Sequence, residues 1–213
     1  MIKLQKEVIK YAKKLNSTNL SILRSGNISL RAKFKNIEGF LITPSGRKYE
    51  TLLPKEIVFV SLDGNYDEEG LKPSSEWKFH QDIYLEKKEA NAIVHAHSLY
   101  ATSLSVHGKL IPAFHYMVAL AGGHDIKCSK YATFGTRALS CNIIKALKDR
   151  RACLMSNHGQ VAYGDDLGKA FELAEEVENL CHQYSEVKKI GNPNILSKKE
   201  MISVLKKIKN YKN

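Results

Sequence analysis

The sequence has no run of apolar residues long enough to cross a membrane, which takes about 18 to 20 in a row. Its first seven residues, Met1-Ile-Lys-Leu-Gln-Lys-Glu7, form a charged amphipathic start without the apolar block of a secretory signal peptide. We therefore expect a cytoplasmic protein with no membrane partner.

Cysteines are few and widely separated, at Cys128, Cys141, Cys153 and Cys181. The absence of a Cys-x-x-Cys pair argues against both a zinc knuckle and a dithiol redox motif. In a reducing cytosol these cysteines would stay as thiols, and we assign none of them a functional role.

Acidic residues are outnumbered, with 22 Asp and Glu against 33 Lys and Arg, which gives a net charge of +11. Such a balance requires nucleic acid to be considered as a partner. The lysines, however, are densest at the two ends of the chain, and no aromatic-interleaved basic block or DNA- or RNA-binding motif is present. We expect solvated helix faces or attraction of a small anionic substrate, and no nucleic-acid partner.

The chain has 213 residues, of which 43% are hydrophobic, and no linker, repeat or low-complexity tract divides it. Apolar spacing predicts helices over residues 2–14, 20–23, 72–88, 99–107, 137–148 and 167–189, and a last helix opened by the capping box Ser197-Lys-Lys-Glu200. Strands are predicted from Ile28 and over 40–43, 57–62, 92–97, 152–155 and 160–163, with an irregular segment at 111–136. The prediction is one α/β domain, residues 1–213, with a central, mostly antiparallel β-sheet flanked by helices.

Two histidines one residue apart are the most informative local pattern. In a strand, the period of two puts His95 and His97 on one face and Ala96 on the other. His158, beside Gly159 at a break between two predicted strands, is the natural third ligand. Three histidines with an open position are typical of catalytic zinc, although manganese or another divalent ion is also compatible with such ligands.

Glu76 is the carboxylate that we add to this set. It lies at the start of a predicted helix, where the helix dipole favours its charge. A carboxylate beside a dication can be a ligand and also a proton-transferring group. Ser-Ser-Glu is equally well explained as an ordinary helix start. His80, one turn later, orients Glu76 or simply packs in the core.

Three small-residue turns share one chemistry: Ser25-Gly26-Asn27, Ser45-Gly46 and Ser74-Ser75. Each offers hydroxyls or backbone N–H groups, which is what an oxyanion such as phosphate needs. Each is also unremarkable as a turn or cap. The predicted hairpin between residues 28 and 43 leaves open whether the first two turns lie at the same end of the sheet.

In order along the chain, these residues resemble the class II aldolase/adducin family. The motifs are Gly26-Asn-x-Ser29, Ile42-Thr-Pro-Ser-Gly46, Pro73-Ser-Ser-Glu-Trp-x-Phe-His80, His95-x-His97 and Asn157-His-Gly159. Three further segments resemble the members that cleave L-fuculose 1-phosphate: Ile111-Pro-Ala-Phe-His-Tyr-Met117, Ala121-Gly-Gly123 and Tyr131-Ala-Thr-Phe-Gly-Thr-Arg137. The last two are more specific than the metal motif.

The resemblance implies a three-layer α/β/α fold, a homotetramer with active sites between subunits, and one Zn²⁺ per subunit. It implies that His95, His97, His158 and Glu76 bind the metal, and that Glu76 is also the catalytic acid/base. The phosphate site would consist of Gly26, Asn27, Ser45, Gly46, Ser74 and Ser75. Tyr116 would reach a neighbouring subunit's site and protonate the departing aldehyde oxygen, and Phe134 and Tyr211 would line or close the aldehyde pocket.

Two positions depart from the family pattern. Ser45 stands where threonine is common, which is a conservative change. Arg24 stands where a small hydroxyl residue is common, which puts one phosphate contact in doubt. Beyond Asn192 the resemblance is loose, so the assignment of Tyr211 is the weakest.

The activity implied is the reversible cleavage of L-fuculose 1-phosphate, a small phosphorylated sugar, to dihydroxyacetone phosphate and L-lactaldehyde. Retro-aldol cleavage leaves negative charge on the ketone half, which a dication stabilises as a Lewis acid. The alternatives are an aldolase for 5-deoxyribulose 1-phosphate or 5-methylthioribulose 1-phosphate, a sugar-phosphate 4-epimerase or dehydratase, and a non-enzymatic adducin-like interaction module. Such a module should have lost metal ligands, and all four are present here.

Overall fold

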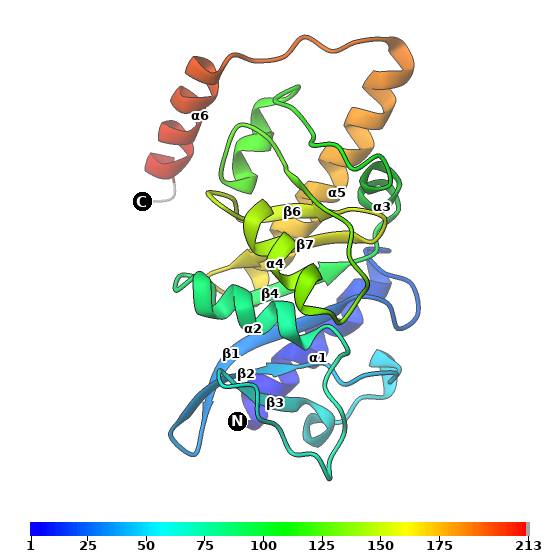
Figure 1. Cartoon of the computed structure of the whole chain (residues 1–213), viewed down its shortest axis with the longest axis vertical. Coiled ribbons are helices and arrows are strands. Elements are labelled where there is room, and N and C mark those ends of the chain that lie inside the picture. The colour runs from blue at the N-terminus through cyan, green and yellow to red at the C-terminus, as the bar shows by residue number, and fades with distance from the viewer. Residues whose placement is uncertain (212–213) are drawn as a thin grey trace.

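A seven-stranded sheet with strand order β3-β2-β1-β4-β7-β6-β5 forms the centre of the computed structural model (Figure 1). The structure describes residues 1–211, without the side chain of Tyr211. All neighbouring strands are antiparallel except β5 and β6, which are parallel. The strands are β1 (Asn27–Phe34), β2 (Ile37–Ile42), β3 (Val58–Ser61), β4 (Ala92–Ala96), β5 (Cys128–Ser129), β6 (Ala152–Met155) and β7 (Gly159–Gly164).

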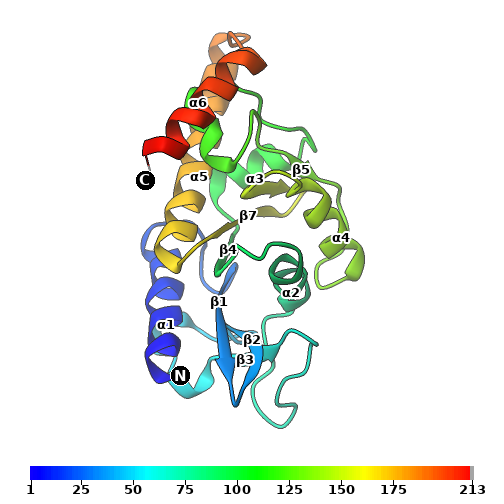
Figure 2. The same ribbon diagram turned by 90° about the vertical axis from the view of Figure 1, so that its left-hand side faces the viewer.

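Helices cover both faces of this sheet, which gives three layers (Figure 2). One face packs against α1 (Ile2–Ser17), α3 (Leu99–Ser105) and α5 (Leu167–Ile190), and the other against α2 (Trp77–Glu86) and α4 (Arg137–Ala146). The last helix, α6 (Lys198–Tyr211), lies against the 3-10 helix η3 (Tyr116–Ala121). None of the helices that the structure describes is long and apolar enough to span a membrane.

Strand alternation divides the hydrophobic core into two clusters. In β4, Ala92, Val94 and Ala96 pack toward α1, α3 and α5, whereas Ile93 packs toward α2 and α4. All are fully buried. His95 is in phase with Ile93, so the alternation places its side chain on the α2 face of the sheet.

The predicted fold class is confirmed, and so is the capping box of α6, in which Ser197 Oγ accepts from Glu200 N–H and Glu200 Oε2 accepts from Ser197 N–H. The helix predicted over residues 20–23 is wrong. Asn19 and Leu23 have φ values of 58° and 61°, and this left-handed backbone interrupts a helix on either side of Leu20. The segment over 111–136 is also not wholly irregular, because it contains η3 and β5, which are too short to give a periodic signal.

Candidate metal and substrate site

Three histidines converge at one end of β4. His95 lies within the strand, and His97 follows directly after it, as the period of two predicted. His158 lies in the turn between β6 and β7. A Cβ atom on Gly159 would lie 2.3 Å from the carbonyl oxygen of Ala96, so only glycine allows β7 to approach β4 this closely beside His158.

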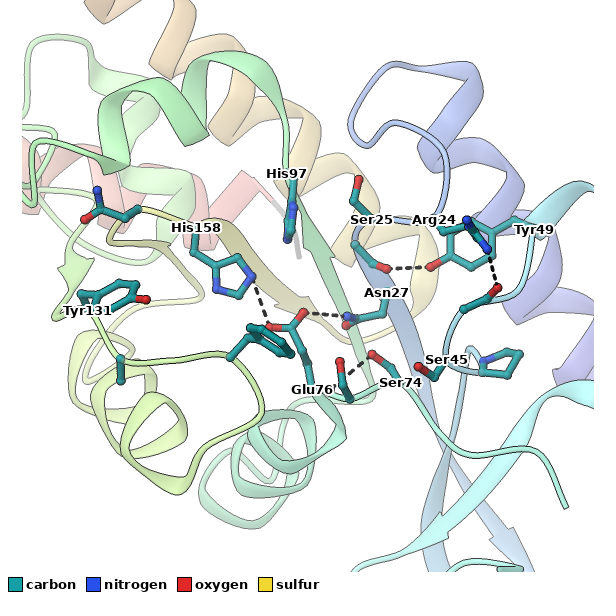
Figure 3. A pocket seen from close by; sticks show the side chains of 17 residues that line it. Arg24, Ser25, Asn27, Ser45, Tyr49, Ser74, Glu76, His97, Tyr131 and His158 are labelled. Atoms are coloured by element: carbon teal, nitrogen blue, oxygen red, sulfur yellow. Dashed lines mark hydrogen bonds and ion pairs between the residues drawn. The ribbon is translucent and has the colours of Figure 1, made fainter. Parts of the chain in front are cut away.

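The ligand atoms of these histidines and Glu76 form one compact group. Nε2 of His95 lies 2.9 Å from Nε2 of His97 and 3.0 Å from Oε2 of Glu76. Oε1 of Glu76 lies 3.2 Å from Nε2 of His158. All four ligand atoms lie within 4.8 Å of one another. Figure 3 shows Glu76 between His158 on one side and Asn27 on the other.

The chemistry of these atoms fits a divalent cation. Nδ1 of His95 lies 2.8 Å from the carbonyl oxygen of Gln160, so Nδ1 carries the proton and the Nε2 lone pair faces the group. Two imidazole Nε2 atoms 2.9 Å apart need a proton or a cation between them. Oε1 of Glu76 is buried and accepts no hydrogen bond from any described residue. A cation would satisfy these atoms together.

Burial and neighbouring charges favour the ligand forms of these side chains. Burial and the nearby His95 lower the pKa of His97 to about 3 and that of His158 to about 4, which keeps both rings neutral. Burial raises the pKa of Glu76, but the three surrounding histidines, His95 first, outweigh it and lower that pKa to about 2. Neutral imidazoles and an ionised carboxylate are the forms that bind a metal ion.

Glu76 does not lie within the helix as predicted. Helix α2 begins at Trp77, and Glu76 immediately precedes it with φ −103° and ψ 9°. Trp77 N–H donates to the carbonyl of Ser74, so the chain turns just before the helix. This turn directs the Glu76 carboxylate toward β4.

One cavity of about 360 Å³ joins the metal-ligand group to the small-residue turns. It is lined by Glu76, His97 and His158 and by every predicted phosphate residue: Gly26, Asn27, Ser45, Gly46, Ser74 and Ser75. The β1–β2 register pairs Ser29 with Ile42, so the first two turns lie at the same end of the sheet. An antiparallel β-bridge between Pro44 and Pro73 brings the third turn, Ser74-Ser75, to the same place.

Backbone hydrogen bonds join the two turns at residues 44–46 and 73–75. Ser45 N–H donates to the carbonyl of Lys72, and Ser74 N–H donates to that of Thr43. These serines therefore offer hydroxyls, and not N–H groups, to a ligand. The N–H groups of Gly46 and Ser75 have no acceptor among the described residues and lie in the same wall.

The remaining predicted residues are placed differently. Phe134 lines the cavity and is 64% exposed. Tyr116 is 51% exposed at the start of η3 and is not among the cavity-lining residues of its own chain. The side chain of Tyr211 lies outside the described part of the chain.

The sequence assigned Tyr131 no role in the site, and it left the roles of Arg24 and His80 open. Tyr131 lines the cavity at one end and Arg24 at the other (Figure 3). His80 is fully buried, and its Nε2 and Nδ1 atoms bond to Asn27 Oδ1 at 2.5 Å and Ser29 Oγ at 2.7 Å. Asn27 and Ser29 are two residues apart and so share one face of a strand, and this spacing was the only sign in the sequence that one side chain could bond to both.

The fold and this group of ligands define an α/β protein with a candidate divalent-metal site open to a polar cavity. Residues 6–185 match the family model described as class II aldolase and adducin N-terminal domain. The chain therefore belongs to the class II aldolase and adducin family, as its motifs indicated.

Named relatives cover nearly the whole chain. A 5-methylthioribulose-1-phosphate/5-deoxyribulose-1-phosphate aldolase of Rhodospirillum rubrum is 44% identical over 99% of this chain and 93% of its own. An L-fuculose phosphate aldolase of Escherichia coli K12 is 43% identical over 98% and 95%. A solved structure of L-fuculose 1-phosphate aldolase superposes with a TM-score of 0.91 at 39% identity, covering 97% of this chain and 96% of that one.

Metal binding should stabilise the fold. At an ion concentration of about 100 times Kd, binding adds about 2.7 kcal/mol, which raises the Tm of a chain of this size by about 5–10 °C. Thermal unfolding of chelator-stripped protein with and without Zn²⁺ measures this shift. His158→Ala should lose most of it, and His107→Ala, which alters an exposed histidine outside the group, should keep it. Equal shifts in both variants would rule out this site.

Acid should destabilise the metal-stripped protein through His80. Burial, and then His95, lower the folded-state pKa of His80 to about 3, whereas an unfolded histidine titrates near 6.5. Below about pH 6.5 the unfolded state therefore binds a proton that the folded state does not, and the free energy of unfolding falls by up to about 1.4 kcal/mol per pH unit. Urea unfolding at pH 7, 6 and 5 should show a shallower decline in His80→Gln, and parallel declines would contradict this.

Proposed function

We propose that the protein catalyses the reversible retro-aldol cleavage of L-fuculose 1-phosphate to dihydroxyacetone phosphate and L-lactaldehyde. The observation that carries this proposal is the single cavity in which three histidines and Glu76 lie beside serine hydroxyls and free N–H groups. Such a cavity suits a substrate that has both a phosphate and adjacent oxygen atoms able to bind a cation.

A second candidate substrate class follows from the names of the relatives. The Rhodospirillum rubrum protein is named for 5-methylthioribulose 1-phosphate and 5-deoxyribulose 1-phosphate. Cleavage of these sugars, like that of L-fuculose 1-phosphate, yields dihydroxyacetone phosphate, and only the aldehyde differs. The phosphate and metal ends of the cavity would thus serve all three substrates, and the residues around the aldehyde would decide between them. Tyr131 and Phe134 occupy that position in this proposal.

The chain's own residues account for binding of the phosphate end. The hydroxyls of Ser45, Ser74 and Ser75 and the N–H groups of Gly46 and Ser75 would donate to phosphate oxygens. Gly46 has φ +71°, and a Cβ atom there would meet no neighbour within 4 Å, so its role is to give the turn its left-handed backbone. Gly26 and Asn27 complete this wall.

Proton transfers complete the reaction. In cleavage, the C3–C4 bond breaks, its electron pair stays on C3, and the C4 hydroxyl loses its proton as the aldehyde forms. Glu76 would take up a proton from solvent and deliver it to C3, so that one proton is lost from the C4 hydroxyl and one is gained at C3; its position in the cavity suits this role. Tyr116 of a neighbouring subunit would accept the C4 hydroxyl proton in cleavage and protonate the aldehyde oxygen only in the reverse direction. Such a site requires an oligomer, and we propose the homotetramer that the family resemblance implies.

His95, His97, His158 and Glu76 would hold the metal ion, which we propose to be Zn²⁺. When bound, the ion would withdraw electron density from the substrate carbonyl and hydroxyl oxygens as a Lewis acid. Burial of the ligands strengthens such electrostatic effects, since His95 is fully buried and Glu76 is 7% exposed.

Release of dihydroxyacetone phosphate tests the activity. Zinc-loaded protein should release it from L-fuculose 1-phosphate, 5-deoxyribulose 1-phosphate or 5-methylthioribulose 1-phosphate, and the ratio of kcat/KM values identifies the substrate. His95→Ala should lower the rate at least about 100-fold, because it removes a ligand of the Lewis acid. NMR of the products distinguishes an epimerase or dehydratase, which would leave the carbon chain intact. Absence of products from all three substrates would support an interaction module instead.

Arg24 should contribute charge to phosphate binding. One N–H of its guanidinium donates to the carbonyl of Gly46 at 3.0 Å, and the exposed side chain lines the cavity beside the serines. An exposed ionic contact contributes at most about 1 kcal/mol, so Arg24→Ser should raise KM and the inhibition constant of inorganic phosphate about 5-fold. Salt should reduce this effect. Arg47→Ser is the matched control, because Arg47 pairs with Glu56 and does not line the cavity. Equal constants in both variants would show that Arg24 does not bind phosphate.

A further inference from the structure

Two rows of polar side chains face each other behind the metal-ligand group. Asn27 and Ser29 point from β1 toward α2, and His80 and Tyr84 lie one turn apart on the side of α2 that meets β1. Glu76 is four residues before His80 and extends this second row. Of these five residues, none is more than 7% exposed.

The hydrogen bonds along these rows have only one consistent direction. The ionised Glu76 can only accept, so Asn27 Nδ2 donates to its Oε2 at 3.1 Å. Asn27 Oδ1 must then accept from His80 Nε2–H. This fixes the His80 tautomer and leaves its Nδ1 as an acceptor.

The directions of the remaining hydrogen bonds, to Ser29 and Tyr84, follow in the same way. Ser29 Oγ donates to His80 Nδ1 and accepts from the Tyr84 hydroxyl, each at 2.7 Å. Tyr84 is itself held by Arg31, whose Nη2 donates to the Tyr84 carbonyl at 2.9 Å and whose guanidinium lies 4.8 Å from the ring centre. Each side-chain nitrogen and oxygen atom of Asn27, His80, Ser29 and Tyr84 has a hydrogen-bond partner, and a buried network satisfied in this way is rigid.

The two oxygens of Glu76 therefore have different surroundings. Oε2 receives the Asn27 hydrogen bond, whereas Oε1 is buried and accepts no hydrogen bond from the described residues. Each oxygen also lies beside one histidine, Oε2 at 3.0 Å from Nε2 of His95 and Oε1 at 3.2 Å from Nε2 of His158. A carboxylate held through one oxygen can rotate little about its terminal bond, so the other oxygen keeps its position.

We propose that Asn27, His80, Ser29 and Tyr84 form a positioning network that fixes Oε2 of Glu76 and leaves Oε1 as the oxygen that exchanges protons with the substrate. The part that concerns proton exchange rests on the proposed function. The part that concerns the orientation of Glu76 does not. His80 therefore positions Glu76, and its role is not packing alone.

A matched pair of substitutions at His80 separates positioning from packing. In His80→Gln the side-chain amide can still donate to Asn27 Oδ1, whereas His80→Met has a similar volume and no donor. Loss of the network should slow proton exchange about 10- to 100-fold, the effect typical of removing a partner that orients a metal ligand. We expect this loss in His80→Met and less than about 5-fold loss in His80→Gln.

Two readouts test the network. The first is exchange of the C3 proton of dihydroxyacetone phosphate with deuterium from D₂O, followed by NMR without any aldehyde. The second is the visible absorption of the Co²⁺-loaded protein, which reports ligand geometry and requires no activity. In His80→Met the Co²⁺ bands should change and exchange should slow, with kcat falling more than KM rises. His80→Gln should keep the wild-type Co²⁺ bands and lose far less of its exchange rate than His80→Met.

Ser29→Ala provides a second test of the network if His80→Met fails to fold. It removes the donor to His80 Nδ1 and the acceptor for Tyr84, and it should slow exchange about 3- to 10-fold. Ser61→Ala is its control, because Ser61 is a buried serine of β3 outside the network. Slower exchange in Ser29→Ala than in Ser61→Ala supports the proposal.

The outcomes separate this proposal from the proposed function. If the wild type exchanges no proton but the Co²⁺ spectra of the Gln and Met variants differ as expected, the reaction is wrong and the positioning role stands. If the wild type is active and the Gln and Met variants have equal exchange rates and equal Co²⁺ spectra, the network does not position Glu76. Equal rates in Ser29→Ala and Ser61→Ala would overturn it in the same way.

Discussion

The site depends on the approach of His95 and His97, whose Nε2 atoms lie 2.9 Å apart inside the protein. Two lone pairs at this distance repel each other unless a proton or cation lies between them, and burial removes the water that would otherwise weaken that repulsion. Strand pairing fixes the backbones of both residues at the end of β4, and Nδ1 of His95 is bound to Gln160 on the next strand. The fold thus holds the two ring nitrogens at a distance that is favourable only with a proton or a cation between them.

The sheet register brings the other parts of the site to this pair. Asn27 lies directly opposite His95 in the β1–β4 pairing, and Glu76 contacts both of them through Oε2. Glycine at position 159 lets β7 come close enough to place His158 on the other side. Each neighbour of β4 therefore provides one part of the metal-ligand group or its support.

The cavity separates two kinds of chemistry over a short distance. Neutral imidazoles and a carboxylate form one region, and hydroxyls, N–H groups and Arg24 form the other (Figure 3). The first suits a cation and the second an oxyanion, so under the proposed function a substrate with a phosphate near two adjacent oxygens would bind in one orientation. The chain's net charge of +11 favours approach of such an anion.

The sequence alone was sufficient for the elements with a clear period and for the ligand types. The alternation through Ala92 to His97 predicted the shared face, and the motifs predicted the family that the comparison confirmed. The turn at residues 18–25 was not predictable, because Leu20 is buried while Ile22 and Leu23 are exposed, an outcome decided by packing and by left-handed backbone at Asn19 and Leu23.

Only the tertiary structure decided which groups meet. The sequence gives His80 as one histidine among eight, with orientation or packing equally open. Its two ring nitrogens find partners on β1, 51 and 53 residues away along the chain. The same folding uses the N–H groups of Ser45 and Ser74 to join two turns and leaves those of Gly46 and Ser75 free. Hydrogen bonds between distant segments depend on register and approach, which local spacing does not contain. The residue types that make the site are thus a property of the sequence, and their pairing is a property of the fold.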